Sequence, residues 1–455
     1  MPDNISVEER GQLYAKELGK LIERPTISAD LPKLLNLPVD AGPEYFARFR
    51  ETLEEVFPLV HSNLEIVRVK DDALLFRWKG KSADKPIVLL AHQDVVPAEE
   101  GAWKYPPFSG TVADGKIWGR GAMDCKNVIY SSLRAIEELL AEGFIPEYDV
   151  YFASSDSEEI AGGGAPAIRD YLKERGVNPF IVLDEGGIII DKLFAPVKKP
   201  FAVIGIVEKG FGVIKFSAKS RGGHTTAPPK NTPFERLARF IVDVHSHSYF
   251  KPYFSPELVK TVKALADGVS PPLKFVFKHI RLFAPLVSRM LPKLHPFGGG
   301  LLCTNITFTM SGGAIVPNMI PPEAYVVANL RYSAYQTVAD CNKLFERLIK
   351  KYDLEMEVIA AQDATSTVDT DSDGYRYLTD CIRETFPDIG IAPYIVLGGT
   401  DGRHFSEISP CSLRFSPVRL SSEQLATMHG LDENLDISAL VESVVFLKRF
   451  IQNHK

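Results

Sequence analysis

Hydrophobic positions in the first part of the chain follow two different periods. Leu and Ile recur at helical spacing over residues 5–24 and 44–57, and residues 128–142 are amphipathic in the same way, so three helices are predicted. Short apolar runs without alternation are typical of strands in a sheet that is covered on both faces. They predict strands at 64–69, 73–78, 86–91, 148–154 and 181–183, with a Pro- and Leu-rich loop at 31–43. Alternating strands and helices indicate an α/β sheet with a substantial parallel part.

Polar side chains follow the ends of three of these strands. His92 comes just after the 86–91 strand, the pair Glu158 and Glu159 follows the 148–154 strand, and Asp184 ends the strand that begins at 181. In open sheets of this kind, ligands bind beyond the carboxyl ends of the strands. The sequence therefore predicts a site at this edge of the sheet.

A second unit is predicted from about residue 206. Its elements follow the order βαββαβ, which is the ferredoxin-like pattern, and after Thr365 the pattern resembles the first part again. The predicted boundaries are 1–205 and 363–455 for a discontinuous first domain and 206–362 for an inserted one. The inserted pattern consists of strands 212–218, 305–310, 324–332 and 354–360 and helices 233–246 and 338–352.

Residues 249–301 interrupt the inserted pattern. They contain Pro-Pro pairs and a mostly apolar, basic run, Phe275–Leu294, which predicts a helix. One interpretation leaves this helix partly exposed at an interface or a substrate entrance. The other packs the whole insert on its own domain, and the sequence leaves both open.

The amino-acid composition disfavours nucleic-acid-binding, membrane-spanning and disulfide-rich proteins. At 455 residues the chain is too long for one core, and its 45% hydrophobic and 24% charged residues are ordinary for a globular protein. A net charge of −6 gives no basic footprint for nucleic acid. No apolar run is long enough to predict a membrane span, and no signal peptide is visible. Five widely spaced cysteines suggest neither a disulfide framework nor a thiolate zinc site, so we expect a cytoplasmic protein.

Five imidazole and carboxylate side chains stand in contexts that together are typical of a two-metal site. Two His and three carboxylates are what two zinc ions need if each is to keep an open position for water and substrate. The chain is therefore predicted to be a metal-dependent hydrolase. The five residues are His92, Asp124, Glu159, Asp184 and His429.

The first two of these residues have simpler alternatives. His92 and Asp94 are two apart at a strand end and project to the same face, so one can bind metal while the other accepts the ring N–H. A His-x-Asp alone is more often a structural hydrogen bond. Asp124 follows a glycine-rich turn and precedes a helix, which suits either a metal bridge or a helix N-cap.

The carboxylate pair is more informative. Neighbouring carboxylates such as Glu158 and Glu159 repel each other unless positive charge holds them in place, and two metal ions supply it. Glu159 can then bind metal while Glu158 faces the metal-bound water as general base. A solvated acidic turn is the alternative, which the run Gly162–Gly164 makes less favourable. Asp184, on a buried strand end, needs a partner or a metal.

Taken in order from about residue 60 to 450, these motifs resemble the di-zinc aminoacylase and carboxypeptidase family. The run Ile280–Arg289 is similar to the carboxypeptidase S and N-fatty-acyl-amino-acid synthase/hydrolase branch. The resemblance implies a zinc-exopeptidase-like α/β sheet covered by helices, with an inserted ferredoxin-like lid domain. The motifs are His92-Gln93-Asp94-Val95-Val96-Pro97, Gly119-Arg120-Gly121-Ala122-Met123-Asp124, Ser157-Glu158-Glu159, Asp184-Glu185-Gly186-Gly187 and Met428-His429-Gly430.

The resemblance also implies roles for the matching residues. Glu158 would be the general base and acid, Asp94 would orient His92, and the peptide bond after Asp124 would be cis. Cys125 stands where the family often has Asp or Asn, which leaves a reactive or metal-sensitive thiol open. The implied ligands, for zinc or for cobalt or manganese in its place, are His92 and Asp184 at one ion, Glu159 and His429 at the other, and Asp124 as the bridge.

The inserted domain carries further similar motifs. The run Arg221–Pro229 looks like the family's lid motif, which implies that His224 stabilises the tetrahedral oxyanion, usually in the active site of the partner subunit, and hence a homodimer. An arginine fork suits the carboxylate of a substrate. The implied substrate-binding residues are Asn318, Arg331, Gly399 and Arg403.

The predicted function is hydrolysis of the amide bond of N-acyl amino acids, fatty-acyl ones included, or of a C-terminal peptide bond. A metal-bound hydroxide would attack the carbonyl with Glu158 as base. The aromatic residues Trp103 and Phe108 and the apolar insert suggest an apolar acyl group. The alternatives are a di- or tripeptidase, a non-catalytic binding protein that retains the fold, and an amide synthase that runs the same chemistry backwards.

Overall fold

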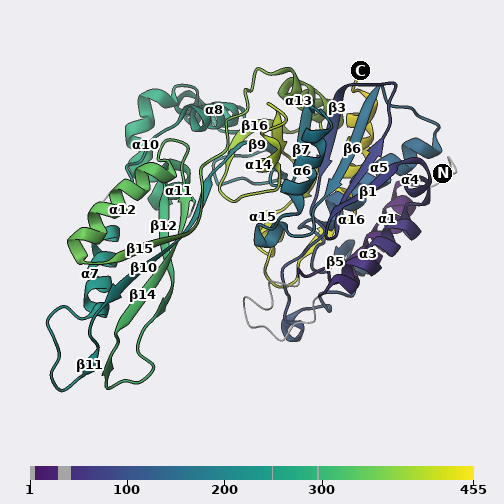
Figure 1. Cartoon of the computed structure of the whole chain (residues 1–455). Helices are drawn as coiled ribbons and strands as arrows, with labels where there is room; N and C mark the ends of the chain where they lie inside the picture. Colours follow the sequence, from purple (N-terminus) through teal and green to yellow (C-terminus); the bar gives the residue numbers. More distant parts are fainter. Residues whose placement is uncertain (1–5, 29–41, 248, 295–296) are drawn as a thin grey trace.

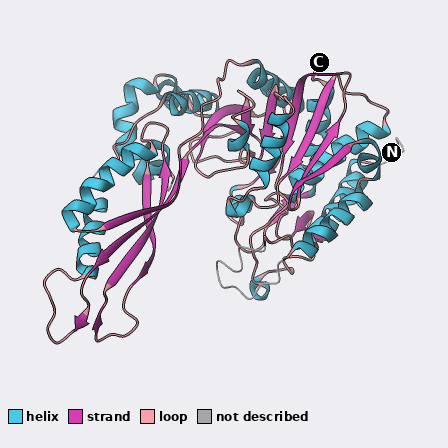
Figure 2. Cartoon of the chain, viewed as in Figure 1, coloured by secondary structure: helices cyan, strands magenta, loops and turns pink. Residues whose placement is uncertain are grey.

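Two units stand apart in the molecule (Figure 1). This computed structural model describes residues 6–28, 42–247, 249–294 and 297–455, so most of the predicted 31–43 loop lies outside the described residues. The large unit is built on a ten-stranded sheet and the small unit on a four-stranded one. Figure 2 shows helices around the first sheet and along the second.

The sheet of the large unit has the order β1-β2-β6-β3-β7-β17-β9-β8-β18, with β16 beside β9. Its central pairs, β3 with β6, β3 with β7 and β7 with β17, are parallel, so their carboxyl ends lie at one edge. The strands are β1 Glu65–Lys70, β2 Ala73–Trp78, β3 Ser82–Leu90, β6 Tyr148–Ser154, β7 Ile181–Asp184, β8 Ile189–Ile190, β9 Phe201–Glu208, β16 Gly390–Val396, β17 Ser412–Arg414 and β18 Arg419–Leu420.

Helices cover both faces of this sheet, as the apolar runs predicted. Ile87 and Leu89 of β3 belong to the core shared with α1, α5 and α16, while Val88 and Leu90 face α6 on the other side. Ser6 begins α1 with a capping box to Glu9. The helices are α1 Val7–Ile22, α3 Pro43–Val56, α4 Pro58–Asn63, α5 Lys126–Ala141, α6 Gly164–Glu174, α13 Asp373–Thr385, α14 Gly402–Phe405, α15 Ser422–Leu425 and α16 Ile437–Gln452. A small sheet adds β4 Thr111–Ala113, β5 Lys116–Trp118 and β19 Asn434–Asp436.

The small unit has the antiparallel sheet β12-β14-β10-β15, which is the ferredoxin-like arrangement that the βαββαβ order predicted. The ring centroid of Phe216 in β10 lies 4.6 Å from that of Phe240 in α7 and 5.3 Å from that of Phe345 in α12. Both helices therefore pack on one face of the sheet. The elements are β10 Gly210–Lys219, β11 Gly223–His224, α7 Pro233–Ser246, β12 Asn305–Gly312, β13 Met319–Ile320, β14 Glu323–Tyr332, α12 Val338–Tyr352 and β15 Glu355–Gln362.

The insert forms α8 Pro256–Ala264, the 3₁₀ helix Leu265–Gly268, α9 Pro271–Lys278, α10 Ile280–Leu294 and α11 Gly298–Leu302. The run Phe275–Leu294 is therefore helical but divided at His279. Leu265 packs with Phe201 and Ala392 of the large unit, so this part of the insert does not pack on its own domain. Among the described helices, none has both the length and the apolarity needed to cross a membrane.

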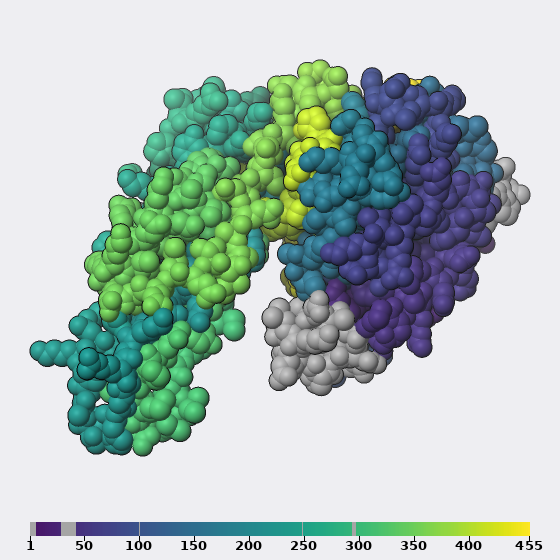
Figure 3. All heavy atoms as spheres, viewed as in Figure 1, coloured from purple at the N-terminus to yellow at the C-terminus, as the bar shows by residue number. Residues whose placement is uncertain are grey.

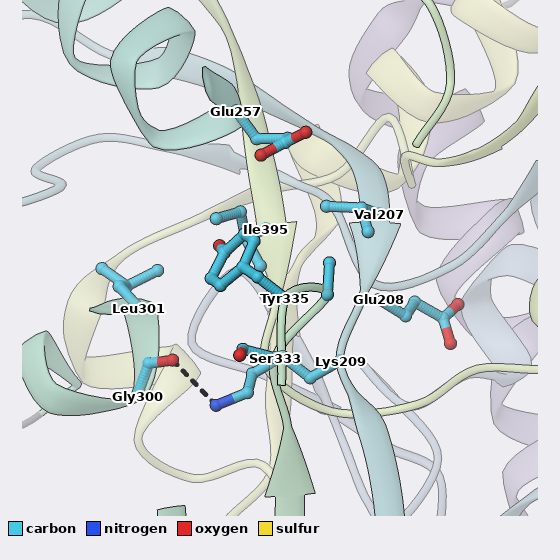
Figure 4. A pocket seen from close by; sticks show the side chains of 10 residues that line it. Val207, Glu208, Lys209, Glu257, Gly300, Leu301, Ser333, Tyr335 and Ile395 are labelled. Atoms are coloured by element: carbon cyan, nitrogen blue, oxygen red, sulfur yellow. Dashed lines mark hydrogen bonds between the residues drawn. The ribbon is translucent and has the colours of Figure 1, made fainter. Parts of the chain in front are cut away.

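The chain passes between the two units at two neighbouring points. Lys209 at the first point donates hydrogen bonds to the carbonyls of Gly300 and Cys303 and to the side chain of Asn305, at 2.7–2.9 Å. These bonds close a cavity of about 10 Å³, enough for one water, between both units and the insert (Figure 4). The second point, Thr365, is tied to Glu208 by two hydrogen bonds.

Candidate metal centre and active site

His92 and Asp94 lie just beyond the carboxyl end of β3. The His92 side chain is buried, and its Nδ1 lies 2.9 Å from the backbone carbonyl of Asp94 and 3.4 Å from Oδ1 of the same residue. The closer acceptor is thus the carbonyl, which fixes Nε2 as the ring atom that is free to face a ligand. This Nε2 lies 2.9 Å from Oδ1 of Asp124.

Asp124 lies between two imidazoles. Its Oδ1 faces His92, and its Oδ2 lies 3.0 Å from Nε2 of His429. The helix α5 begins two residues later, at Lys126, with Cys125 as its N-cap, so the N-cap interpretation of Asp124 is wrong. The peptide bond between Asp124 and Cys125 is cis, as the family resemblance implied.

Cys125 is a buried thiol behind His92. Its Sγ exchanges hydrogen bonds with the backbone N–H and carbonyl of His92, at 3.2 and 3.4 Å. Burial raises the pKa of this thiol well above its usual value, which keeps it protonated. A reactive thiol at this position is therefore disfavoured.

The Glu158–Glu159 pair is not a solvated turn. The carboxylate of Asp94 accepts the backbone N–H of Glu158 at 3.0 Å and that of Glu159 at 3.1 Å, so one side chain fixes both. The Glu159 side chain is 7% exposed, and its Oε1 lies 3.3 Å from Nε2 of His429. Among the described residues this buried oxygen has no hydrogen-bond donor of suitable geometry.

Within the described part of the chain, possible metal-ligand atoms gather in two groups. His92, Asp124 and Cys125 form one group and Asp124, Glu159 and His429 the other, each with its ligand atoms within 4.8 Å of one another. Asp124 belongs to both, which is what a bridging ligand requires. Asp184 belongs to neither of these groups. Its Oδ2 accepts the backbone N–H of Gly402 at 2.5 Å.

Two buried carboxyls of the site escaped sequence reasoning. Burial, with the charges of Asp124 and Asp184, raises the pKa of Glu185 well above its usual value. Burial and the charge of Asp184 raise the pKa of Asp401 to about 8. Glu185 directly follows the predicted ligand Asp184, and Asp401 lies in the glycine-rich loop Gly398–Arg403. Closeness in sequence to predicted site residues was the signal that could have found them.

Glu433 also escaped notice, and it supports the turn before Asp124. Its Oε1 accepts the backbone N–H groups of Gly121, Met123 and Asp124 at 2.7–3.1 Å. Its Oε2 pairs with Arg120 at 2.7 Å. A carboxylate four residues after His429 thus fixes the loop that carries the shared carboxylate.

Burial and the close packing of carboxyls with imidazoles shift the pKa values of the site. Burial raises the pKa of Glu158 well above its usual value, with His92 opposing the shift and Asp401 adding to it. A hydrogen bond to Asp124 and the nearby carboxylate of Glu159, at 3.3 Å, raise the pKa of His429 to about 10. Burial acts to raise the pKa of Asp124, but hydrogen bonds from His429 and His92 bring it well below its usual value.

These observations fit bound cations. Buried carboxylates are stable when they are paired or coordinate metal, and here several of them share two imidazoles. The Oε1 of Glu159 has a lone pair to offer and no donor among the described residues. Nitrogen and oxygen ligands of this kind suit zinc, cobalt and manganese.

Arg331 and Arg403 form a second feature of the site. Burial lowers the pKa of Arg331, and the charge of Glu158 opposes this shift, so the guanidinium lies within electrostatic reach of the general-base candidate. Burial also lowers the pKa of Arg403, and Arg331 is among the charges that add to the shift. The Nε of Arg403 is buried and lacks an acceptor among the described residues.

Gly399 belongs to the same loop as Arg403. A Cβ at this position would lie 3.1 Å from Nη1 of Arg403, so a side chain here would press on the guanidinium. Thr400, the next residue, is held by the buried Glu208, which accepts its hydroxyl at 2.7 Å. Glu208 also lies 3.8 Å from Nη1 of Arg403, so one buried carboxylate contacts both Thr400 and Arg403.

His224 and Asn318 are not brought to this cluster. They lie on and beside the short β11–β13 pair, at the far end of the small unit in Figure 1. The backbone of Thr225 donates to the carbonyl of Asn318 at 3.2 Å, and the His224 ring contacts Thr226. Both side chains are exposed. They are close to each other but not to the metal-ligand candidates of their own chain.

Comparison with known proteins identifies the relatives of the chain. A profile of the peptidase family M20/M25/M40 matches residues 88–453. A Bos taurus protein named N-fatty-acyl-amino acid synthase/hydrolase is 34% identical over 461 residues, which cover 100% of this chain and 90% of that protein. A Dictyostelium discoideum protein named probable carboxypeptidase S-like 2 is 34% identical over 418 residues, which cover 90% of this chain and 79% of that one. The resemblance and branch expected from the motifs are confirmed.

Solved structures share the fold. A metallo-carboxypeptidase of this family from Sulfolobus solfataricus superposes with a TM-score of 0.68 at 16% identity, covering 96% of this chain and 98% of that one. Human carnosine dipeptidase 1 gives a TM-score of 0.66 at 14% identity, covering 98% and 97%. The predicted fold class is therefore confirmed.

Proposed function

The chain belongs to the peptidase family M20/M25/M40 and is a metal-dependent hydrolase of amide bonds, and from that premise we propose that it cleaves N-acyl amino acids, long-chain ones in particular. The observation that carries the proposal is the position of Glu158. Asp94 holds its backbone beside Asp124 and the two imidazoles, while Arg331 lies within electrostatic reach. A candidate base, candidate metal ligands and a candidate carboxylate anchor in one place support the proposal.

The centre would hold two zinc ions, with cobalt or manganese as alternatives. His92 and Asp124 would contribute to one ion, and Asp124, Glu159 and His429 to the other. Asp184, the ligand that the resemblance implied for the first ion, would join them while its Oδ2 accepts the backbone N–H of Gly402. When bound, the ions would lower the pKa of a water and polarise the amide carbonyl.

Glu158 would move the proton. Its burial beside other carboxyls raises its affinity for a proton, so it can accept one from the attacking water and deliver it to the leaving nitrogen. Asp94 would act as a positioning residue, since its carboxylate fixes the backbone of both glutamates. His224 would stabilise the oxyanion in the site of a partner copy, so we propose a homodimer.

The amino-acid end of the substrate would bind between Arg331 and Arg403, with Asn318 and Gly399 nearby in the closed enzyme. The buried Nε of Arg403 lacks an acceptor among the described residues, and a carboxylate supplies one. Arg331 stacks over Phe211, 5.2 Å from the ring centroid, which holds its fork in place. The acyl chain would lie on apolar side chains, with Trp103 and Phe108 as candidates.

The experiment is hydrolysis of a small panel by the purified, zinc-loaded protein, with and without chelator. The panel pairs N-acetyl, N-lauroyl and N-oleoyl amino acids with unblocked dipeptides. We expect chelator-sensitive cleavage that favours the long acyl chains. Cleavage of dipeptides alone would contradict the proposal and make the chain a dipeptidase. The proposed cytoplasmic location is tested separately, by imaging a tagged full-length chain.

A further inference from the structure

The helix α10 presents an unusual outer face. The α10 face is formed by Arg281, Leu282, Leu286, Arg289, Met290 and Lys293, all of which are exposed. At about 100° per residue these positions fall within one half of the helix circumference. Ile280 and the half-buried positions between them point the other way, toward α8, α9 and α11.

The exposed apolar side chains on this face are large. Leu282 is 77% exposed, Leu286 56% and Met290 45%. A surface helix normally turns its polar positions outward, and these three lie in one row at i, i+4 and i+8. Phe275 of α9 is also 58% exposed, and its ring lies 6.4 Å from that of Phe283 of α10. Contiguous apolar area of this kind indicates a binding surface.

The charge on the same surface has one sign. From residue 268 to 322 the chain contains no Asp or Glu, although its net charge is −6. Arg281, Arg289 and Lys293 form no ion pair or hydrogen bond with a described residue, whereas Lys274 of α9 pairs with Asp267 at 2.8 Å. Three unpaired cations therefore lie among three exposed aliphatic side chains.

We propose that the α10 face docks the enzyme on a membrane surface that carries anionic phospholipid. A basic amphipathic helix lies in the plane of such an interface, with its apolar side chains in the headgroup and acyl boundary and its cations at the phosphates. The α10 helix lies at the outer edge of the molecule in Figure 1, and the teal surface around it is open in Figure 3. A bilayer can therefore approach it without a change in the fold.

The mixture of side chains selects this partner over a second protein. Apolar and cationic residues alternate along one convex helix instead of forming an apolar centre with a polar rim, which is the pattern of protein interfaces. Cations beside anionic headgroups gain from the negative surface potential, and the aliphatic row gains from leaving water. The two contributions act together only on an anionic bilayer.

The test is co-flotation of the full-length protein with lipid vesicles. Vesicles of phosphatidylcholine alone are compared with vesicles that contain about a third phosphatidylserine, at low and high salt. We expect binding to the anionic vesicles, weakened by salt. The double variant Leu282→Glu with Leu286→Glu should lose roughly tenfold or more of it, because two charges enter the apolar boundary.

A matched control places the same charges elsewhere. Val7 and Ile145 of the large unit are 71% and 61% exposed, so Val7→Glu with Ile145→Glu should float like the wild type. All three proteins should melt alike and hydrolyse a short-chain substrate alike, since none of these residues lies in the site. A second variant, Arg289→Glu with Lys293→Glu, should lose the preference for phosphatidylserine.

Three outcomes would overturn the proposal. The first is that the wild type floats with neither kind of vesicle, and the second is that it floats equally with neutral and anionic vesicles. The third is that the control variant loses as much flotation as the Leu282→Glu and Leu286→Glu variant. A smaller oligomer for the Leu282→Glu and Leu286→Glu variant, with no vesicle binding by the wild type, would make the α10 face a contact between copies of the chain and would also overturn it.

Discussion

The large unit and the small unit contribute to the proposed site in different ways. In the large unit each candidate ligand is fixed by its own chain: His92 by the Asp94 carbonyl, the two glutamates by the Asp94 carboxylate, and the Asp124 turn by Glu433. In the small unit, His224 is exposed, its strand pairs with β13, and its ring contacts Thr226 two residues along the chain. One chain should therefore be enough to bind the metal ions. Complete catalysis should require the large unit of one chain together with the small unit of a partner copy.

The largest expected effect is that of Glu158→Gln. Removal of the proton carrier should lower kcat by roughly 10²–10⁴-fold, because the amide cannot accept a proton. The variant should bind as much metal as the wild type, measured by elemental analysis of the dialysed protein. Loss of metal together with activity would instead make Glu158 a ligand, and normal turnover would remove it from the mechanism.

His224→Ala should follow, with kcat about 10²–10³-fold lower and metal content unchanged. Because His224 lies away from the metal-ligand candidates of its own chain, a second result is expected. Mixing this variant with Glu158→Gln under conditions that exchange subunits should restore activity, because one site of each mixed dimer then has both residues intact. Recovery is measured against each variant alone. A mixture that stays inactive would mean that His224 serves its own chain.

Arg331→Met should act mainly through substrate binding. Loss of a charged hydrogen bond to the substrate carboxylate should raise KM by about 10–100-fold. The effect should be much smaller for the matching N-acyl amino acid amide, which lacks that charge. Arg236→Met is a matched control, since Arg236 of α7 pairs with Asp353 in the small unit, away from the cluster. Equal losses on acid and amide would argue against a carboxylate anchor.

The smallest effect is one of pH on stability. Burial, with the charges of Arg403 and Arg169, lowers the pKa of His404 to about 4, against about 6.5 when the chain is unfolded. The unfolded chain therefore binds this proton first, and stability is lost as pH falls from 6.5 toward 4. Between pH 7 and 5, the free energy of unfolding should fall by roughly 1 kcal/mol more in the wild type than in His404→Gln. Urea titrations of the metal-free proteins measure both changes. An equal fall in unfolding free energy in both proteins would mean that the fold does not lower the pKa of His404.

The spacing of apolar residues predicted the helices and strands that depend on local sequence. The strand β3, the helix α7 and the ferredoxin-like order all follow from apolar spacing, and strand ends placed His92, Glu158 and Asp184 at one edge. The break at His279 was missed, because both sides of it are equally apolar and only the burial of Ile280 in the fold distinguishes them.

Long-range contacts could not be predicted in this way. The bond from Gly402 to Asp184 and the support of the Asp124 turn by Glu433 join residues more than two hundred positions apart. The family resemblance supplied ligands but not these contacts. It is the fold that keeps Asp184 outside both ligand groups and brings Arg331 toward Arg403.

The central claim is that His92, Asp124, Glu159 and His429 of one chain form a two-metal centre on which hydrolysis depends. Its most direct test is metal content and N-oleoyl amino acid hydrolysis, measured together on wild type and His429→Ala after dialysis. We expect two ions per wild-type chain, no more than one in the variant, and loss of turnover with the missing ion. Full turnover by a wild-type chain stripped of metal would contradict it.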